Sequence, residues 1–537
     1  MASLALYTVV FLVSLLFLYL YRAYIAKSSL PLPPGPPALP IIGNVHQAPK
    51  SYPWLQYHAW GKTYGPVLHL NMLGQPVIVL STSAAAHDLL AKRGATFSDR
   101  PRFVVAAELA LKGMHMLLRP YDERFRVHQK LESPLLSMRA ASAYLPFQEL
   151  ESKQLLYDLL GNAGGSGGDC HGHFERTTAS IIYGLFYGFR LKTASDPVLL
   201  TAHSVNHEFD QLAQVGKYLV DSFPVLNNLP GSLAPWKAEA EKHWERQRAL
   251  HVGNLQQGYA ANGWNFSKQM KKTLDNEAID MSEEELALDV GIMADAALDA
   301  STETLMWFVV ACITSNKGFI AKAQNHLDTV VGRDRLPDFA DRPQLLYIDA
   351  IVEELLRWRP AGAAGVPHFT KVESSYKGYR IPANSVVIPN HWSMTREEEV
   401  FGSNVEDFSP ERWLPSANPD DGTPCAPSGL RDLPIVGFGY GRRLCPGRHV
   451  ARNVLWITIA RVLWAFEIEP GLSETGERLA VDSMAATDGL VSKPLPFKAS
   501  FKPRGSWVND IVMAECDTHD VAFADILHRI GGDMAPR

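Results

Sequence analysis

The chain has 537 residues, of which 46% are hydrophobic and 20% charged, and these proportions exclude an intrinsically disordered protein. Lys and Arg number 51 against 57 Asp and Glu, and a net charge of −6 excludes the basic footprint of a nucleic-acid-binding protein. Five cysteines in so long a chain, with no CxxC pair, exclude a disulfide scaffold and argue against a cysteine zinc site.

The first predicted element is an uncharged apolar run from Leu4 to Tyr21. It reaches the minimum of about 17 residues that a helix needs to cross a bilayer. Arg22 and Lys27 follow the run and no charged side chain precedes it, which places the rest of the chain in the cytosol. A cleaved signal peptide is the alternative, but the chain lacks both a basic start and a small-residue cleavage site. Residues 1–25 are therefore predicted to be a membrane anchor.

A proline-rich stretch follows the anchor, with six prolines between Pro31 and Asn44. Proline fixes φ and removes a backbone donor, so neither a helix nor a central strand is expected there. The plain interpretation is a linker. The more specific one is that residues 26–44 form a semi-rigid hinge that sets a globular body against the membrane.

The body shows mixed patterns in which helices dominate. Alternating apolar residues predict a β-hairpin over 63–81, and helical spacing predicts a long buried helix over 286–315 and another helix over 346–358. Short strand-like pieces occur at 379–382 and 386–389, and the glycine-rich stretch 161–168 predicts a surface loop. We expect a mainly α fold with a smaller β region.

The clearest chemical pattern lies in residues 436–449, where Phe438, Gly441, Arg443, Cys445 and Gly447 follow the order F-x-x-G-x-R-x-C-x-G. A cysteine thiolate can hold haem iron, and its electron donation favours O–O cleavage. Glycines allow tight turns that bring amides near the sulfur, and an Arg can pair with a haem propionate. The alternative is a glycine-rich loop around a structural cysteine, which five positions in register make a weak explanation.

This loop resembles the haem-binding signature of the cytochromes P-450. Glu354 and Arg357 match the family's E-x-x-R motif, and at i,i+3 spacing they share a helix face. Residues 408–413 are similar to the family's P-E-R-F segment, so that Arg412 would join Glu354 and Arg357 in a structural triad. The resemblance covers roughly Leu4 to Arg504.

The resemblance implies a cytochrome P-450 fold in a single large haem-thiolate domain over 45–504, preceded by the transmembrane helix and followed by a C-terminal tail over 505–537. It implies a b-type haem with Cys445 as axial iron ligand. NADPH electrons would arrive through a membrane-bound P-450 reductase, with cytochrome b5 as a further donor. The location would be the endoplasmic reticulum membrane, with one span and a cytosolic catalytic domain. Residues 366–370, 388–394 and 487–497 are similar to fungal secondary-metabolism members.

The long helix departs from the family pattern at the oxygen-activating position. The family's A-G-x-D-T-T reads here as residues 296–301 with Asp299 in place, Ala300 at the usual threonine and Ala297 at the usual glycine. Asp299 and Ser301 are the candidate catalytic residues, although Ser301 is turned about 100° from position 300 on a regular helix. Three explanations stay open: a helix distortion that brings Ser301 in, protons supplied by substrate and water, or chemistry that depends less on this relay. Asp299 as a merely buried acid is the plain alternative.

A second departure concerns the segment that usually reads W-x-x-x-R and contacts a haem propionate. Phe125 replaces the Trp and Gln129 replaces the Arg. His128 is the candidate for the propionate contact, with Lys130 as alternative and a solvent-facing role for both as the plain interpretation.

The predicted function is a haem-thiolate monooxygenase that inserts one oxygen atom of O2 into an apolar secondary metabolite such as a terpenoid, polyketide or alkaloid. The small side chains of 361–367 predict room for a bulky apolar molecule. The alternative is a haem-thiolate enzyme that catalyses oxidative coupling, rearrangement or dehydration. A pseudoenzyme that retains the fold as a binding protein is a third hypothesis, against which the intact Arg443 and Cys445 argue.

Overall fold

The structure is a computed structural model that describes residues 11, 13–18, 30–161, 168, 170–214, 216–415, 429–515 and 519–534. Most of the predicted anchor and most of the glycine-rich stretch 161–168 lie outside the described residues.

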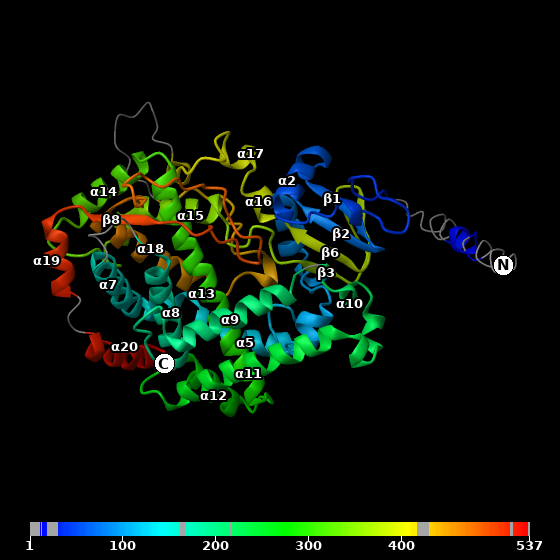
Figure 1. Ribbon diagram of the computed structural model, residues 1–537, viewed down its shortest axis with the longest axis horizontal. Helices are drawn as coiled ribbons and strands as arrows, with labels where there is room; N and C mark the ends of the chain where they lie inside the picture. Colours follow the sequence, from blue (N-terminus) through cyan, green and yellow to red (C-terminus); the bar gives the residue numbers. More distant parts are fainter. Residues whose placement is uncertain are drawn as a thin grey trace.

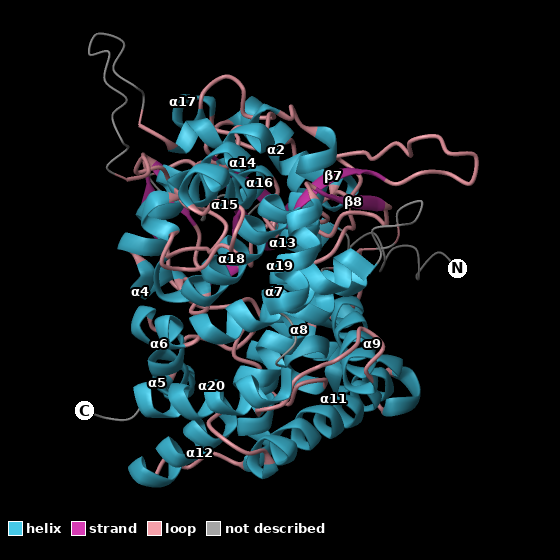
Figure 2. Ribbon diagram, turned by 90° about the vertical axis from the view of Figure 1, so that its left-hand side faces the viewer, coloured by secondary structure: helices cyan, strands magenta, loops and turns pink. Residues whose placement is uncertain are grey.

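Helices make up most of the body (Figure 2). The described α-helices are α2 Pro53–Tyr64, α3 Ser83–Ala86, α4 Gly94–Phe97, α5 Glu123–Leu136, α6 Met138–Ala143, α7 Leu145–Gly161, α8 His171–Tyr187, α9 Pro197–Leu212, α10 Leu219–Ser222, α11 Pro235–Ala260, α12 Phe266–Glu277, α13 Glu283–Thr314, α14 Gly318–Val330, α15 Leu346–Trp358, α16 His391–Met394, α17 Glu398–Phe401, α18 Arg448–Ala465, α19 Ser506–Glu515 and α20 His519–Asp533. The helices predicted over 286–315 and 346–358 are confirmed as α13 and α15.

The β region is a four-stranded sheet in the order β1-β2-β6-β3 and two ribbons, β4-β5 and β7-β8. Their bounds are β1 Val67–Met72, β2 Gln75–Leu80, β3 His368–Thr370, β4 Ser374–Tyr376, β5 Tyr379–Ile381, β6 Ser385–Pro389, β7 Phe466–Pro470 and β8 Ala499–Pro503. Met72 pairs with Gln75, which confirms the predicted hairpin and leaves a two-residue turn at Leu73 and Gly74. Both turn residues have positive φ, as tight hairpins require.

Local sequence explains where the central helix α13 begins. Ser282 is its N-cap, and the Ser282 hydroxyl accepts a hydrogen bond from the Glu285 amide at 3.1 Å. Glu283, Glu284 and Glu285 then place negative charge on the first turn, where the helix dipole favours it. The remaining 29 residues lack Pro, so one helix runs through the molecule (Figure 1).

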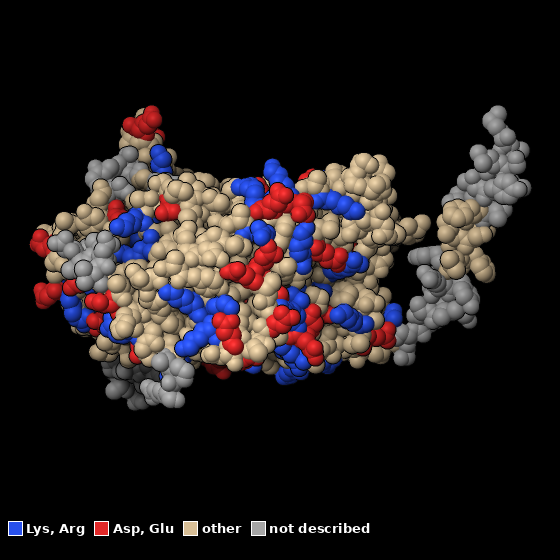
Figure 3. Space-filling view, turned by 90° about the horizontal axis from the view of Figure 1, so that it is seen from below, with Lys and Arg blue, Asp and Glu red and all other residues tan. Residues whose placement is uncertain are grey.

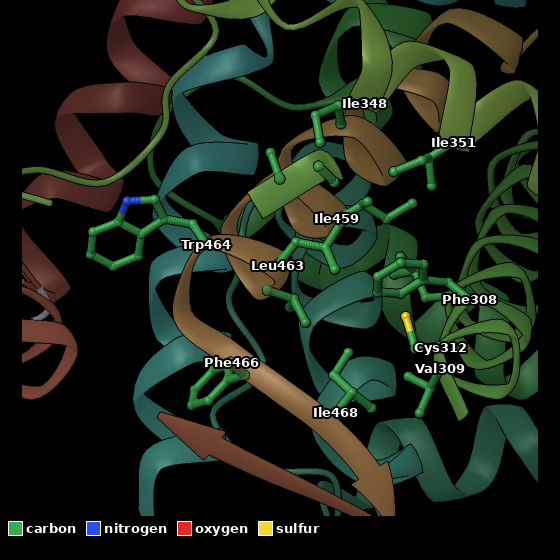
Figure 4. Close-up of a cluster of buried hydrophobic side chains, with 14 of the residues drawn as sticks. Phe308, Val309, Cys312, Ile348, Ile351, Ile459, Leu463, Trp464, Phe466 and Ile468 are labelled. Carbon is green, nitrogen blue, oxygen red and sulfur yellow. The ribbon is translucent and has the colours of Figure 1, made fainter. Parts of the chain in front are cut away.

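The main hydrophobic core lies where α13, α15, α18 and β7 meet (Figure 4). Phe308 and Cys312 from α13 face Ile351 from α15 and Ile459 and Leu463 from α18. These side chains are fully buried, and burying each contributes about 1.5–3 kcal/mol relative to exposure. This core fixes α13 against α18, and α18 follows directly on the Cys445 loop.

The described part of the predicted hinge is held against the sheet. The His69 amide donates to the Pro34 carbonyl at 3.0 Å and the Arg380 amide to the Pro31 carbonyl at 2.8 Å. Asn44 is buried, and its side-chain oxygen accepts from the Asn71 amide at 2.8 Å. Residues 31–44 therefore move with the catalytic body.

The C-terminal tail forms two helices, α19 and α20, at the end of the molecule opposite the four-stranded sheet (Figure 1). Both contact α7. Val508 and Val512 of α19 join the main core, and Ile526, Leu527 and Ile530 of α20 are buried in a second core cluster with helix α8. The apolar face of α20 thus completes a core instead of resting on a finished surface.

Candidate active site

Cys445 lies in a loop that joins the body of the molecule to the start of α18. The Cys445 amide donates to the Phe438 carbonyl at 2.9 Å, which closes the loop on itself. Gly447 is the N-cap of α18, so the sulfur lies beside the positive end of an 18-residue helix. The loop thereby presents one thiol at a site that favours negative charge.

Gly441 and Gly447 of this loop differ in how much space a side chain would have. Gly441 has φ of 58°, and a Cβ there would lie 2.2 Å from the Leu90 carbonyl oxygen. Any side chain at 441 would therefore push the loop away from residues 87–92. A Cβ at Gly447 would meet no atom within 4 Å, so open space lies beside this residue.

The Cys445 sulfur is enclosed by the protein, and burial raises the pKa of its thiol. The backbone amides of Gly447 and Arg448 donate to the sulfur and act in the opposite direction. The side chain is nevertheless only partly covered. The Cys445 sulfur is thus surrounded by protein atoms but not in contact with them on every side, so it borders an internal space. A metal ion bound in that space would deprotonate the thiol.

Arg443 and Arg100 are two neighbouring cations near this loop. Arg443 donates to the carbonyls of Ser98 and Arg119 at 2.8 and 2.6 Å, and Arg100 donates to that of Pro367 at 2.6 Å. Within the described residues, neither guanidinium forms a salt bridge with a carboxylate. Burial lowers the pKa of Arg443 to about 10, and burial also lowers the pKa of Arg100 well below its ordinary value. Two neighbouring guanidinium groups without a carboxylate salt bridge, Arg100 buried and Arg443 half-buried, fit an acidic ligand.

Several side chains at the centre of α13 are not fully covered by the rest of the protein. Residues 301–312 are all buried, whereas Ala296 is exposed and Ala297 and Ala300 are partly exposed. Ala296, Ala297 and Ala300 have short side chains, which leaves room beside this part of the helix. The start of α18, which follows the Cys445 loop, packs near this part of α13, because Val450 and Val454 share a core cluster with Leu298.

The Asp299 side chain forms a salt bridge with Lys493. Its carboxylate lies 3.1 Å from the Lys493 ammonium, which itself lies 3.8 Å from the Glu303 carboxylate. Ser301 is nearly fully buried one residue further along. The helix is regular from Glu283 to Thr314, so the distortion that would bring Ser301 to the position of Ala300 is not present. The catalytic roles of Asp299 and Ser301 stay predictions.

His128 is fully buried between α5 and α13. Its Nε2 lies 2.9 Å from Glu285 and its Nδ1 lies 2.8 Å from Asp289. Burial alone would lower the pKa of His128, but the two carboxylates raise it to about 9. Both ring nitrogens are thus already taken, and the predicted propionate contact of His128 stays a prediction. Lys130 pairs with Glu277 at the surface.

The structure brings Glu354, Arg357 and Arg412 together. Glu354 is fully buried, accepts from Arg357 Nε at 2.8 Å and from Arg412 Nε at 3.0 Å, and also accepts from the Trp413 indole at 3.0 Å. Arg357 further donates to the carbonyls of Thr395 and Val405. These groups tie α15 to the 395–413 segment, and none of them faces the Cys445 sulfur.

Comparison with known proteins identifies the class. The cytochrome P-450 family description matches residues 33–501. Over most of its length the chain is similar to cytochrome P-450 monooxygenase drtD of Aspergillus calidoustus, with 36% identity over 517 residues, 95% of this chain and 94% of the relative. Cytochrome P-450 monooxygenase FrzL of Cladobotryum sp. is 35% identical, with 95% and 94% covered. Cytochrome P-450 monooxygenase peniB of Penicillium patulum is 36% identical, with 90% and 87% covered.

The chain belongs to the cytochrome P-450 family, and it is therefore an oxidoreductase of the monooxygenase class that uses haem and receives electrons from a reductase. The residues present fit a haem. Cys445 supplies an enclosed sulfur, Gly447 adjoins open space, and Arg443 with Arg100 supplies cations without carboxylate partners. When bound, the haem supplies oxygen activation.

Two residues of this site are absent from the sequence predictions. Arg100 is one, and its only sequence signal is the Arg100-Pro101 pair, which is too common to be informative. Lys493 is the other. It lies 194 residues from Asp299 in the chain, so only the fold brings the two together.

Proposed function

We propose that this protein is a membrane-anchored fungal monooxygenase that takes NADPH electrons from a P-450 reductase and inserts one oxygen atom of O2 into an apolar secondary metabolite. The observation that carries the proposal is the Cys445 loop, whose sulfur borders an internal space at the start of α18. Fungal relatives of similar length support the setting.

The chain's own residues have separate tasks in this proposal. Cys445 holds the iron, with the Gly447 and Arg448 amides moderating the charge on the sulfur. Arg443 and Arg100 hold the haem's acidic edge. Ala296, Ala297 and Ala300 leave space along α13 for substrate and oxygen, and Asp299 holds or passes protons at its carboxylate.

The space beside α13 supports a bulky apolar substrate. Ala361, Gly362 and Ala364 follow α15 and are partly exposed, and each has little or no side chain. With Ala296 and Ala300 they form a set of small residues, so shape selects the substrate more than charge does. Terpenoid, polyketide and alkaloid scaffolds all meet this requirement.

Membrane attachment is supported by apolar residues outside the core. Residue 11 and residues 13–18 are helical, and their side chains, Phe17 among them, are exposed. On the body, Ile41, Leu219 and Val225 are at least 66% exposed. One described helix, Glu283–Thr314, is long and apolar enough to span a bilayer, but it is the buried α13. We place the single span in residues 1–25, in the endoplasmic reticulum membrane.

The face of the molecule seen in Figure 3 carries charges of both signs. Figure 3 shows blue and red groups interspersed on one face without a field of one sign. Reductase and cytochrome b5 are the proposed protein partners.

The test is the reduced carbon-monoxide difference spectrum of the full chain in microsomes. We expect a thiolate-type band in the wild type and its loss in Cys445→Ala at retained haem binding. Cys312→Ala is the matched control, because Cys312 is buried among apolar side chains of α13 and faces the core instead of the loop. A thiolate band that survives in Cys445→Ala contradicts the assignment.

Ala300 favours one alternative function, a haem-thiolate catalyst of coupling, rearrangement or dehydration that has less need of the threonine relay. Consumption of NADPH and O2 separates monooxygenation, which consumes both with each product formed, from rearrangement and dehydration, which consume neither. Oxidative coupling also consumes both but sends both oxygen atoms of O2 to water, so labelled oxygen from 18O2 in the product separates it from monooxygenation.

A further inference from the structure

A continuous series of acidic and basic side chains runs from the centre of α13 to the surface. It passes through the residues that we call the relay chain: Asp299, Lys493, Glu303, His171, Glu175 and His203. The contacts come from four separate parts of the fold, namely α13, the 487–495 segment, α8 and α9. Residues so distant in sequence meet only because the helices pack in this way.

The distances suit proton transfer at each step. Asp299 lies 3.1 Å from Lys493, and Lys493 lies 3.8 Å from Glu303. His171 Nε2 lies 3.1 Å from Glu303, and His171 Nδ1 lies 3.8 Å from Glu175. A proton passes directly at about 2.6–3.2 Å or through one water over a longer gap. The two 3.8 Å steps therefore need one water or a small side-chain rotation.

Exposure does not change steadily along the relay chain: Asp299 and Lys493 at the inner end are 16% and 31% exposed, and the most covered residue lies in the middle of the chain. Glu303 is 5% exposed, whereas His171 and His203 are about one-third exposed, at 35% and 33%. His203 lies 2.8 Å from Glu175. The inner end is Asp299, next to the partly exposed Ala300. The chain thus joins bulk solvent to the space beside α13.

We propose that protons reach the active site through this relay chain, with His171 as the entry group and Lys493 as the carrier between Glu303 and Asp299. The inference rests on the proposed function. Each monooxygenation consumes O2, two electrons and two protons, and forms one hydroxylated product and one water. In this chain Ala300 occupies the position of the family's threonine and has no hydroxyl group. Proton delivery to the active site therefore depends more on Asp299.

The transfer through Lys493 balances in charge. His171 takes a proton from solvent and passes it to the Glu303 carboxylate. The Lys493 ammonium then gives a proton to the Asp299 carboxylate as it receives the proton from the Glu303 carboxyl group, which returns Glu303 to a carboxylate. Asp210 also faces Lys493 and Asp299, and burial raises the pKa of Asp210 to about 6. Burial alone would lower the pKa of Lys493, but the carboxylates of Asp299, Glu303 and Asp210 together raise it. Lysine is therefore charged before and after each transfer.

The experiment uses full-length protein with NADPH, reductase and O2 as the only reactants, so no substrate is needed. The readouts are the rate of O2 consumption, the peroxide formed per NADPH and the solvent deuterium isotope effect on that rate. Glu303→Gln and His171→Gln should each slow the proton-dependent reduction of O2 by about tenfold, below the ~100-fold typical of losing a general acid itself. Both should increase the isotope effect. His528→Gln, on the remote helix α20, should match the wild type in all three readouts.

Lys493→Arg separates proton transfer from structure. Arginine keeps both ion pairs but does not release a proton at neutral pH. We expect it to behave like Glu303→Gln. If Lys493→Arg or His171→Gln retains the wild-type rate and isotope effect while the carbon-monoxide spectrum is normal, the relay chain is overturned. A wild type that consumes no O2 with NADPH would instead overturn the proposed function.

Discussion

At the residue scale, we predict that Ala300 lowers the coupling of NADPH and O2 consumption to product formation. A threonine hydroxyl can donate a hydrogen bond and the alanine side chain cannot. We therefore expect proton delivery for oxygen activation to depend more on the Asp299 carboxylate. Asp299→Asn should lower NADPH-dependent turnover by roughly 100-fold, the scale of general acid catalysis. Peroxide released per NADPH measures the loss of coupling.

The substitution Ala300→Thr tests the same hypothesis by restoring the missing hydroxyl group. Ala300 is partly exposed to the space beside α13, so a threonine has room there. Ala300→Thr should lower peroxide release per NADPH at similar NADPH consumption. An unchanged ratio in both variants would show that protons arrive by another route, such as the Ser301 hydroxyl or the substrate.

His128 makes stability depend on pH. Its pKa is about 9 in the folded protein, because Asp289 and Glu285 outweigh burial, against 6.5 when unfolded. The folded state thus binds the proton more tightly, and this stabilisation is complete below pH ~6.5 and is lost as pH rises to about 9. The contribution is up to about 3 kcal/mol.

Urea unfolding followed by tryptophan fluorescence between pH 6 and 9.5 measures this effect. The wild type should lose stability across the range, and His128→Gln should be less stable at pH 6 and nearly flat. Arg124 and Arg119 also face Glu285 and stay charged throughout, so they do not add to the slope. A wild-type profile without a slope contradicts the buried charged histidine.

At the element scale, α20 acts as part of the core. Leu527 is 1% exposed, and its Cβ lies 3.0 Å from the position that a Cβ on Gly263 would take. Leu527→Ala should lower the free energy of unfolding by about 2–5 kcal/mol, as buried leucines do. Arg529→Ala, on the exposed face of the same helix, should change it by no more than about 0.5 kcal/mol.

Deleting residues 505–537 extends this test to both tail helices. The relay chain and the Cys445 loop lie outside them, so the carbon-monoxide spectrum should be retained while the thermal midpoint falls. Normal stability combined with lost turnover would instead indicate a functional tail.

At the scale of the whole molecule, we predict that the membrane anchor, residues 1–25, can be removed without loss of the body. A chain beginning at Leu30 keeps the backbone contacts of Pro31 and Pro34 with the sheet and should bind haem normally. It should leave the membrane in part, because Ile41, Leu219 and Val225 stay exposed. Carbonate extraction and sedimentation of full-length and shortened chains measure this. Failure of the shortened chain to bind haem contradicts the division.

The sequence alone determined what depends on local pattern. Helix α15 matches residues 346–358 because its apolar spacing is regular, and the hairpin matches because Leu73-Gly74 permits one tight turn. The Cys445 loop was identifiable because its glycines, arginine and cysteine are close in sequence. Asp299 and Ala300 were identifiable for the same reason, once the helix was aligned with the family.

The tertiary structure decided every feature that joins distant segments. Lys493 meets Asp299 because the 487–495 segment returns to α13, and Arg100 meets Arg443 across 343 positions. His128 faces Glu285 and Asp289 because α5 lies on α13, which no periodicity within α5 specifies. The tail helices α19 and α20 are part of the core for the same reason. An apolar stripe in the sequence predicts that one helix face is buried, but it does not predict which element covers that face. Packing brings together charges that the chain keeps apart, and it is packing that sets their pKa values and joins them into a route for protons.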